Sequence, residues 1–280
     1  MIITESFVWL NNPKTASTFV RKTLSELYNR RGKSLVALWR LRNRWMVELE
    51  VPELRPKAGL RAGKLTPHGT INQIPEKYVY LPVVSAIRDP VEKYLSLYSY
   101  ADWKKTDQLP VALDVINKKY PNFPELSFEA FVDYTNDFYG NNRLVIGASV
   151  FNLGPMAADF LRFFCYSYDS NESAFYFQTW EALCSQLAKV IFFHSRTINL
   201  ELYNFLLDLH FDSSDVDFLL SKSPENVSDK IKLTSVNNSL RDCIRKREWL
   251  LTSATQSLSP IDWKLAETAA PTAELLIRPI

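Results

Sequence analysis

A short apolar run, a polar turn and the start of a helix form the sequence feature that most constrains this chain. Residues 7–10 (FVWL) are wholly apolar and typical of a β-strand, and the polar residues NNPKTAST follow them. Over residues 18–28 the apolar side chains recur at the spacing of one helix face. In a strand–turn–helix unit, backbone N–H groups and the positive end of the helix dipole converge on the turn. The stretch therefore predicts an anion site of the kind that holds phosphate.

Polar side chains of the turn would add to this site. Lys14 supplies a full positive charge, and Thr15, Ser17 and Thr18 supply hydroxyl donors. The Walker A pattern of P-loop nucleotide enzymes needs glycines that are absent here, so only Lys14–Thr15 matches it. A polar turn with a solvated lysine is the alternative interpretation of the same residues.

Composition limits the class of protein. The chain has 280 residues, of which 46% are hydrophobic, so it can bury a sizeable core. With a formal net charge of +2 it is no polycation, and we expect no nucleic-acid partner. Three cysteines without C-x-x-C spacing favour reduced thiols in a cytoplasmic protein. We expect no leader peptide, and no membrane span because no apolar run approaches about 18 residues.

A second strand-to-helix junction is predicted further along the chain. Residues 78–87 (YVYLPVVSAI) are typical of a strand buried on both faces of a parallel sheet, with the buried part beginning at Val83. Asp89–Pro90 match the N-cap and first position of a helix. Arg88 would therefore stand at the carboxyl end of a central strand, where α/β sheets bind ligands. The hydroxyl of Ser96, in the second turn of the helix, would be close enough to share an anion with Arg88.

Together these junctions resemble the two signature elements of sulfotransferases that use 3′-phosphoadenosine 5′-phosphosulfate (PAPS). PKTAST at residues 13–18 is similar to the family's 5′-phosphosulfate loop. RDPVEKYLS at residues 88–96 is similar to its 3′-phosphate site, and keeps the arginine and the serine eight residues apart. PENVS at residues 224–228 is similar to a segment whose loop closes over the nucleotide in many members. The resemblance covers about residues 5–110 and 186–250.

The resemblance implies which residues hold the PAPS donor. Arg88 and Ser96 would bind the 3′-phosphate, and Asn226 and Ser228 would lie in the closing loop. The first loop would bind the 5′-phosphosulfate through Pro13, Lys14, Thr15, Ala16, Ser17, Thr18 and Phe19.

The sequence departs from the family pattern at two positions. Ala16 stands where the family usually has glycine, so a left-handed backbone there would cost on the order of 1 kcal/mol. Lys93 stands where arginine is common, which keeps the charge and loses a bidentate fork.

The chemistry of sulfuryl transfer assigns roles to two residues. Negative charge grows on the bridging oxygen that leaves, and Lys14 is placed to neutralise it. The acceptor needs a general base, and we expect His68, in a turn where related sulfotransferases often carry a catalytic histidine or glutamate. Glu92 and Asp102 are the alternative bases, and a surface histidine is the alternative interpretation of His68. We expect no metal, because no acidic cluster with metal-ligand spacing is present.

The predicted fold is α/β: a nucleoside-kinase-like, P-loop-type parallel sheet with helices on both faces. We predict one domain over residues 1–267 and a C-terminal tail over 268–280. Further elements are expected as a strand at 189–193 and as helices at 111–119, 126–138, 156–166, 200–209 and 240–251. Residues 111–185 would form a helical, acceptor-side region.

Residues 30–75 are predicted to form a basic insert or loop. Residues 30–64 hold ten Lys or Arg against three Glu, a local net charge of +7. A charge run of this kind is usually a solvated face. The alternative is an electropositive wall that attracts an anionic substrate.

The sequence thus predicts transfer of the PAPS sulfuryl group to a hydroxyl or amine of a small molecule or glycan, with a carbohydrate acceptor favoured. The alternatives are an ATP-dependent P-loop kinase and a non-catalytic relative that binds an anionic ligand.

Overall fold

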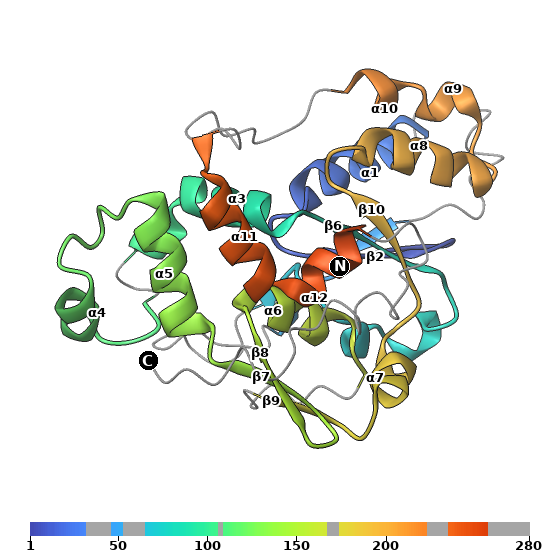
Figure 1. Cartoon of the computed structure of the whole chain (residues 1–280). Helices are drawn as coiled ribbons and strands as arrows, with labels where there is room; N and C mark the ends of the chain where they lie inside the picture. Colours follow the sequence, from blue (N-terminus) through green and yellow to red (C-terminus); the bar gives the residue numbers. More distant parts are fainter. Residues whose placement is uncertain (32–45, 53–64, 106–108, 167–173, 223–234, 257–280) are drawn as a thin grey trace. The chain divides into compact units, whose positions relative to one another are not determined.

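The computed structural model describes residues 1–31, 46–52, 65–105, 109–166, 174–222 and 235–256 (Figure 1). The chain groups into two compact units. Unit 1 comprises residues 1–52, 65–88 and 189–227, and unit 2 comprises residues 53–64, 89–188 and 228–280. The single domain over residues 1–267 stays a prediction.

Unit 1 is built on a mixed five-stranded sheet with the strand order β10-β6-β2-β1-β3. The strands β2, β6 and β10 are parallel, whereas β1 pairs antiparallel with both β2 and β3. Their bounds are Ile2–Thr4 (β1), Val8–Leu10 (β2), Met46–Glu48 (β3), Val83–Ile87 (β6) and Val190–His194 (β10). The α/β class is confirmed. The expectation of a wholly parallel sheet is wrong, because residues 5–7 are too few for the crossover that a parallel β1–β2 pair needs.

The helices of unit 1 pack on the sheet face that carries Trp9, Val84, Ala86 and Phe193. Figure 1 shows these helices gathered on one side of β2, β6 and β10. Leu24 of α1 and Leu202 of α8 are fully buried in this core. The helices are α1 (Ser17–Arg31), α8 (Ile198–Asp208), α9 (Ser213–Val216) and α10 (Phe218–Ser221). Helices on both faces of the sheet stay a prediction.

Smaller elements complete unit 1. Two short strands, β4 (Val51–Pro52) and β5 (Leu65–Thr66), pair antiparallel. Two 3-10 turns, η2 (Ile71–Gln73) and η3 (Glu76–Tyr78), lead into β6. All five residues of β6 are buried, as expected for a central strand that begins at Val83.

Unit 2 combines helices with a three-stranded sheet. The helices are α3 (Pro90–Tyr100), α4 (Leu113–Lys119), α5 (Phe128–Tyr139), α6 (Pro155–Phe164), α7 (Trp180–Gln186), α11 (Asn238–Arg247) and α12 (Trp249–Gln256), with a 3-10 turn η4 (Asp102–Lys104). The strands β7 (Asn142–Ile146), β8 (Ser149–Leu153) and β9 (Ala174–Phe177) have the order β8-β7-β9.

Several predicted elements of unit 2 are confirmed and two predictions need correction. Asp89 caps α3, because its Oδ1 accepts hydrogen bonds from the N–H of Val91 at 2.9 Å and of Glu92 at 3.3 Å. The predicted helices at 111–119, 126–138 and 156–166 match α4, α5 and α6. The helical prediction for 111–185 is incomplete, because β7, β8 and β9 lie there. The last predicted helix is two helices, α11 and α12, that meet at Glu248.

A buried carboxyl group ties together three helices of unit 2. Glu248 is fully buried and accepts hydrogen bonds from the Tyr94 hydroxyl at 2.9 Å and from the N–H of Ala157 at 2.7 Å and Met156 at 3.3 Å. The two N–H groups belong to the first turn of α6, so Glu248 caps that helix. Burial raises the pKa of Glu248 to about 7, although these hydrogen bonds and the nearby charge of Lys93 act in the opposite direction.

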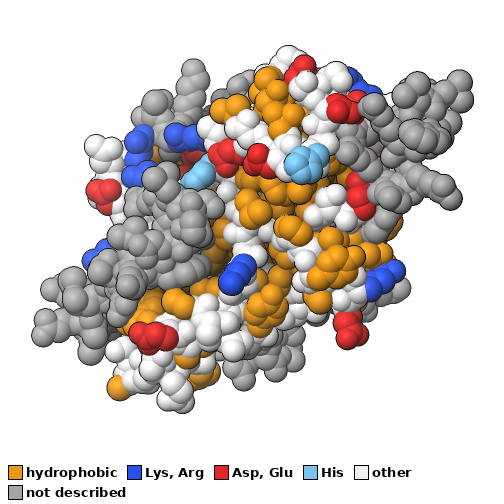
Figure 2. Space-filling model, turned by 90° about the vertical axis from the view of Figure 1, so that its right-hand side faces the viewer, with side chains coloured by type: hydrophobic (Ala, Val, Ile, Leu, Met, Phe, Trp, Pro, Cys, Tyr) orange, Lys and Arg blue, Asp and Glu red, His pale blue; other side chains and the backbone are white. Residues whose placement is uncertain are grey.

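Apolar side chains also reach the surface, and Figure 2 shows several on one face. The most exposed large ones among the described residues include Val79, Tyr80 and Tyr176. No helix in the described ranges is long and apolar enough to span a membrane. The three cysteines are free thiols.

Candidate anion-binding site

The polar turn and Arg88 leave the sheet of unit 1 at the same edge. The parallel register places Leu10 of β2 beside Ser85 of β6, and the Ser85 hydroxyl donates to the Leu10 carbonyl oxygen at 2.8 Å. Both strands therefore end at one edge of the sheet. The turn over residues 11–16 follows β2, and Arg88 follows β6 directly. This is the edge at which open α/β sheets bind ligands.

The turn has an unusual backbone. Lys14 has a φ of 62° and Ala16 a φ of 68°, both in the left-handed region. For a residue with a side chain this conformation costs about 1–2 kcal/mol. Ala16 thus adopts a conformation that normally favours glycine. Strained residues of this kind persist only where the surrounding structure fixes them, and they are concentrated at functional sites.

Side-chain hydrogen bonds hold the turn in place. The Asn12 amide nitrogen donates to the carbonyl oxygen of Ala86 on β6 at 3.3 Å. The Thr15 hydroxyl donates to the Asn12 carbonyl oxygen at 2.9 Å, and the Asn11 amide nitrogen donates to the Pro67 carbonyl oxygen at 3.2 Å. These bonds connect the turn to β6 and to the 66–69 segment. They therefore hold the strained backbone of the turn in its left-handed conformation.

The two asparagines also bring unpaired acceptors to the base of the turn. Asn11 and Asn12 are only 1% and 2% exposed. Their Oδ1 atoms accept no hydrogen bond from any residue that the structure describes. A buried acceptor without a donor costs about 1–3 kcal/mol, so these two oxygens add to the cost of the turn.

The start of α1 directs N–H groups at the turn. The first hydrogen bond of the helix runs from the Val20 N–H to the Ala16 carbonyl oxygen at 3.1 Å. The N–H groups of Ser17, Thr18 and Phe19 precede it and have no acceptor within the helix. Such N–H groups, with the helix dipole behind them, favour an anion in front of α1.

Arg88 lies against this turn. Its Nη1 atom donates a hydrogen bond to the carbonyl oxygen of Lys14 at 3.3 Å, across 74 positions of the sequence. Arg88 as a whole is half-buried. Arg88, the first residue of the second motif, is thus in direct contact with the turn of the first motif within unit 1.

His68, from a distant part of the sequence, lies beside Asn11 at the start of the same turn. Its Nδ1 atom is 2.6 Å from the carbonyl oxygen of Asn11. A carbonyl oxygen only accepts, so Nδ1 carries the proton, and in the neutral ring the lone pair lies on Nε2. This tautomer is the one that a general base acting through Nε2 requires.

The predicted role of the Thr15 hydroxyl as a donor to the ligand needs correction, and the predicted role of Phe19 is limited to its backbone. Thr15 is 1% exposed, and its hydroxyl proton is donated to Asn12, so this hydroxyl closes the turn and is not directed to a ligand. Phe19 is 3% exposed and packs in the core of unit 1, so only its backbone N–H can serve a ligand. Pro13, Ser17 and Thr18 are half-exposed around the turn.

The other predicted residues belong to unit 2 or lie outside the described residues. Ser96 and Glu92 are half-exposed on α3 of unit 2, and the sharing of an anion between Ser96 and Arg88 stays a prediction. Asp102, also in unit 2, pairs with Lys105 at 2.5 Å. Asn226 and Ser228 lie outside the described residues, as does most of the basic 30–64 segment.

Sequence reasoning missed Asn11 and Asn12. A pair of asparagines after a strand is a turn signal, because asparagine tolerates unusual backbone conformations. The signal was present, but their partners Pro67 and Ala86 are 56 and 74 positions away, and no local pattern identifies them.

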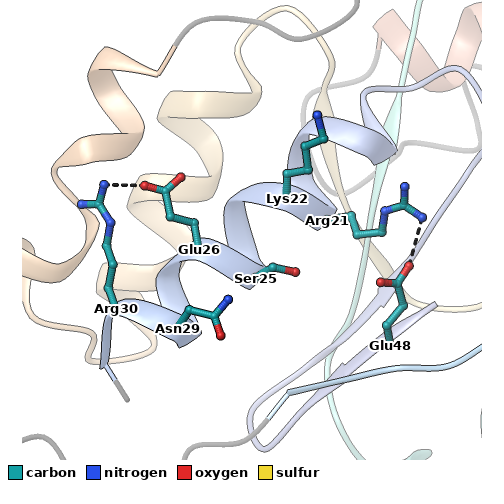
Figure 3. A pocket seen from close by; sticks show the side chains of 7 residues that line it. All are labelled: Arg21, Lys22, Ser25, Glu26, Asn29, Arg30 and Glu48. Atoms are coloured by element: carbon teal, nitrogen blue, oxygen red, sulfur yellow. Dashed lines mark hydrogen bonds and ion pairs between the residues drawn. The ribbon is translucent and has the colours of Figure 1, made fainter. Parts of the chain in front are cut away.

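A separate open pocket of about 530 Å³ lies along the outer face of α1 (Figure 3). None of its lining residues belongs to the turn. Arg21 pairs with Glu48 at 3.1 Å, and Glu26 pairs with both Arg30 and Lys222. Because these cations are neutralised by carboxylates, this pocket carries no functional assignment.

The described residues contain no group of three or more His, Cys, Asp or Glu side chains placed to hold a metal ion. No family model, curated protein or solved structure matches the chain. The resemblance to PAPS-dependent sulfotransferases therefore rests on the motif residues.

Proposed function

We propose that this chain is a sulfotransferase that moves the sulfuryl group of PAPS to a hydroxyl or amine acceptor. One observation carries the proposal: the 3.3 Å hydrogen bond from Arg88 Nη1 to the Lys14 carbonyl oxygen. It joins the residue proposed for the 3′-phosphate to the loop proposed for the 5′-phosphosulfate. A carbohydrate acceptor is part of the proposal, supported by the resemblance and by the basic 30–64 segment.

Each residue of the site would have a defined task. Lys14 would neutralise the bridging oxygen between phosphorus and sulfur as that oxygen leaves. The N–H groups of Ser17 and Thr18 would hold the non-bridging oxygens, and Arg88 would hold the 3′-phosphate. PAPS supplies the activated sulfuryl group.

His68 would act as the general base. Its Nε2 would take the proton of the acceptor hydroxyl while the hydroxyl oxygen forms a bond to sulfur and the bond from sulfur to the bridging oxygen breaks. The product nucleotide, 3′-phosphoadenosine 5′-phosphate (PAP), would leave with the bridging oxygen. Asn11 would fix the base, because its carbonyl oxygen determines which nitrogen of His68 carries the proton.

A transfer assay tests this proposal. Sulfate-labelled PAPS is incubated with the protein and a panel of glycans, phenols and lipids. For an acceptor that is labelled, we expect Lys14→Ala to lower the rate by about 10²–10³-fold, the effect of removing one preorganised charge stabiliser. Lys22→Ala, at an exposed lysine of α1, is the matched control and should leave the rate unchanged. Wild-type transfer by Lys14→Ala would refute the assignment of Lys14.

A further inference from the structure

A second pocket, within unit 2, presents an unpaired cation and an unpaired anion. It has a volume of about 370 Å³, which falls in the range of small-ligand sites. Its lining residues come from the end of α4, one face of α5 and the end of α11. They are Lys119, Tyr120, Asp133, Asn136, Asp137 and Arg247.

Half of the charged groups in this pocket neutralise each other. Asp137 pairs with the Lys119 ammonium group at 2.8 Å and accepts a hydrogen bond from the Tyr120 hydroxyl. Burial and this bond to Asp137 raise the pKa of the Tyr120 phenol, so it stays a donor at neutral pH. Lys119, Tyr120 and Asp137 thus satisfy one another's charges and hydrogen bonds.

Asp133 and Arg247 are the charged groups that remain. Neither forms an ion pair or a side-chain hydrogen bond with any residue that the structure describes. Both line the same pocket. The charge of Arg247 acts to lower the pKa of Asp133, although the two side chains form no ion pair. Burial and the neighbouring Asp137 carboxylate raise the pKa of Asp133, so a cation placed beside this carboxylate is favoured.

Arg247 is held in position by its surroundings. A side chain at Gly140 would place its Cβ 2.9 Å from an Arg247 Nη atom, so the guanidinium group lies directly on the Gly140 backbone. The Nε atom of Arg247 is buried. Packing against this backbone restricts the guanidinium group, and a restricted receptor loses less entropy on binding.

Asn136 adds a donor that has no partner in the described residues. This side chain is only 8% exposed, and its Oδ1 accepts from the Tyr94 hydroxyl at 3.1 Å. Because the oxygen is engaged by Tyr94, the amide nitrogen is the end left for a ligand. This pocket-lining N–H₂ group can donate to a hydrogen-bond acceptor in a ligand.

We propose that this pocket binds a small zwitterion with an ammonium group close to a carboxylate, as in a free α-amino acid. Asp133 takes the ammonium group, and Arg247 and the Asn136 amide nitrogen take the carboxylate. The inference is independent of the proposed sulfuryl transfer, since every residue that it uses lies in unit 2.

Three related probes separate the contribution of each charge. L-Alanine carries both charges, L-alaninamide only the cation, and N-acetyl-L-alanine only the anion. Their affinities for the full chain are measured by ligand-observed saturation-transfer NMR, which detects millimolar binding. We expect alanine to bind saturably and about tenfold more tightly than either analogue.

Variants then locate the site. Asp133→Asn should reduce alanine affinity about tenfold and leave N-acetylalanine unaffected, and it should fold normally because it relieves repulsion with Asp137. Arg247→Gln should have the converse effect, reducing alanine affinity and leaving alaninamide unaffected. Glu129→Gln on α5 and Lys246→Gln on α11 are matched controls that do not line the pocket.

Two results would overturn the proposal. One is that alanine gives no saturable signal, or binds no better than the singly charged analogues. The other is that Asp133→Asn binds alanine as the wild type does. The Asp133→Asn result decides the matter even if Arg247→Gln proves unstable.

Discussion

Replacing Ala16 with glycine should stabilise this protein, although alanine-to-glycine substitutions usually destabilise. Ala16 has a φ of 68°, where a Cβ atom is disfavoured by about 1–2 kcal/mol. Glycine removes that strain. It also makes the unfolded chain more flexible, which costs about 0.4–1 kcal/mol. The difference predicts a net gain of up to about 1.5 kcal/mol in the free energy of unfolding.

Urea unfolding followed by tryptophan fluorescence measures this gain. We expect a higher midpoint at an unchanged slope, which identifies a change in stability alone. The matched control is Ala130→Gly on α5, a partly exposed alanine with a helical backbone, which should lose up to about 1 kcal/mol. If Ala16→Gly destabilised the protein as much as Ala130→Gly does, the left-handed turn and the strain argument would both be wrong.

Two further predictions concern the buried carboxyl group of unit 2. Because burial raises the pKa of Glu248 from 4.5 to about 7, the folded state holds its proton more tightly than the unfolded state does. Its contribution to stability should be complete below pH 4.5 and should fall by about 3 kcal/mol as the pH rises to 7. Urea midpoints from pH 4 to 8 should show this decline for the wild type and a flatter profile for Glu248→Gln. Gly154→Ala should lower the free energy of unfolding by about 1–3 kcal/mol, because its Cβ would lie 2.2 Å from the Glu248 carboxyl group. A wild-type urea midpoint for Gly154→Ala would contradict this packing.

Local signals were sufficient to predict the elements that carry the candidate site. The apolar run before Arg88 and the Asp89–Pro90 cap are determined by neighbouring residues, and β6 and α3 follow them closely. The turn at Lys14 was predicted from its strand and helix flanks. The pairing of β2 with β6 brings Arg88 to Lys14. This pairing depends on contacts across 74 positions of the sequence, so only the structure establishes it.

The three-stranded sheet of unit 2 is an element that the sequence analysis did not predict. The register from Ile146 to Ser149 leaves a two-residue hairpin loop, and Gly147 in that loop has a φ of 57°. A glycine between two apolar-alternating runs is a recognised hairpin signal, so this sheet was predictable in part. By contrast, nothing near Glu248 predicts its burial, because its partners Tyr94 and Ala157 are 154 and 91 positions away.

Calorimetric titration of PAP tests the central claim most directly, since Lys14 and Arg88 are proposed to hold one nucleotide. We expect the wild type to bind PAP more tightly than it binds ATP with Mg²⁺. Arg88→Ala should weaken PAP binding at least tenfold, the effect of losing a charged hydrogen bond. Absent PAP binding, tighter binding of ATP with Mg²⁺, or unchanged PAP affinity in Arg88→Ala would contradict the account.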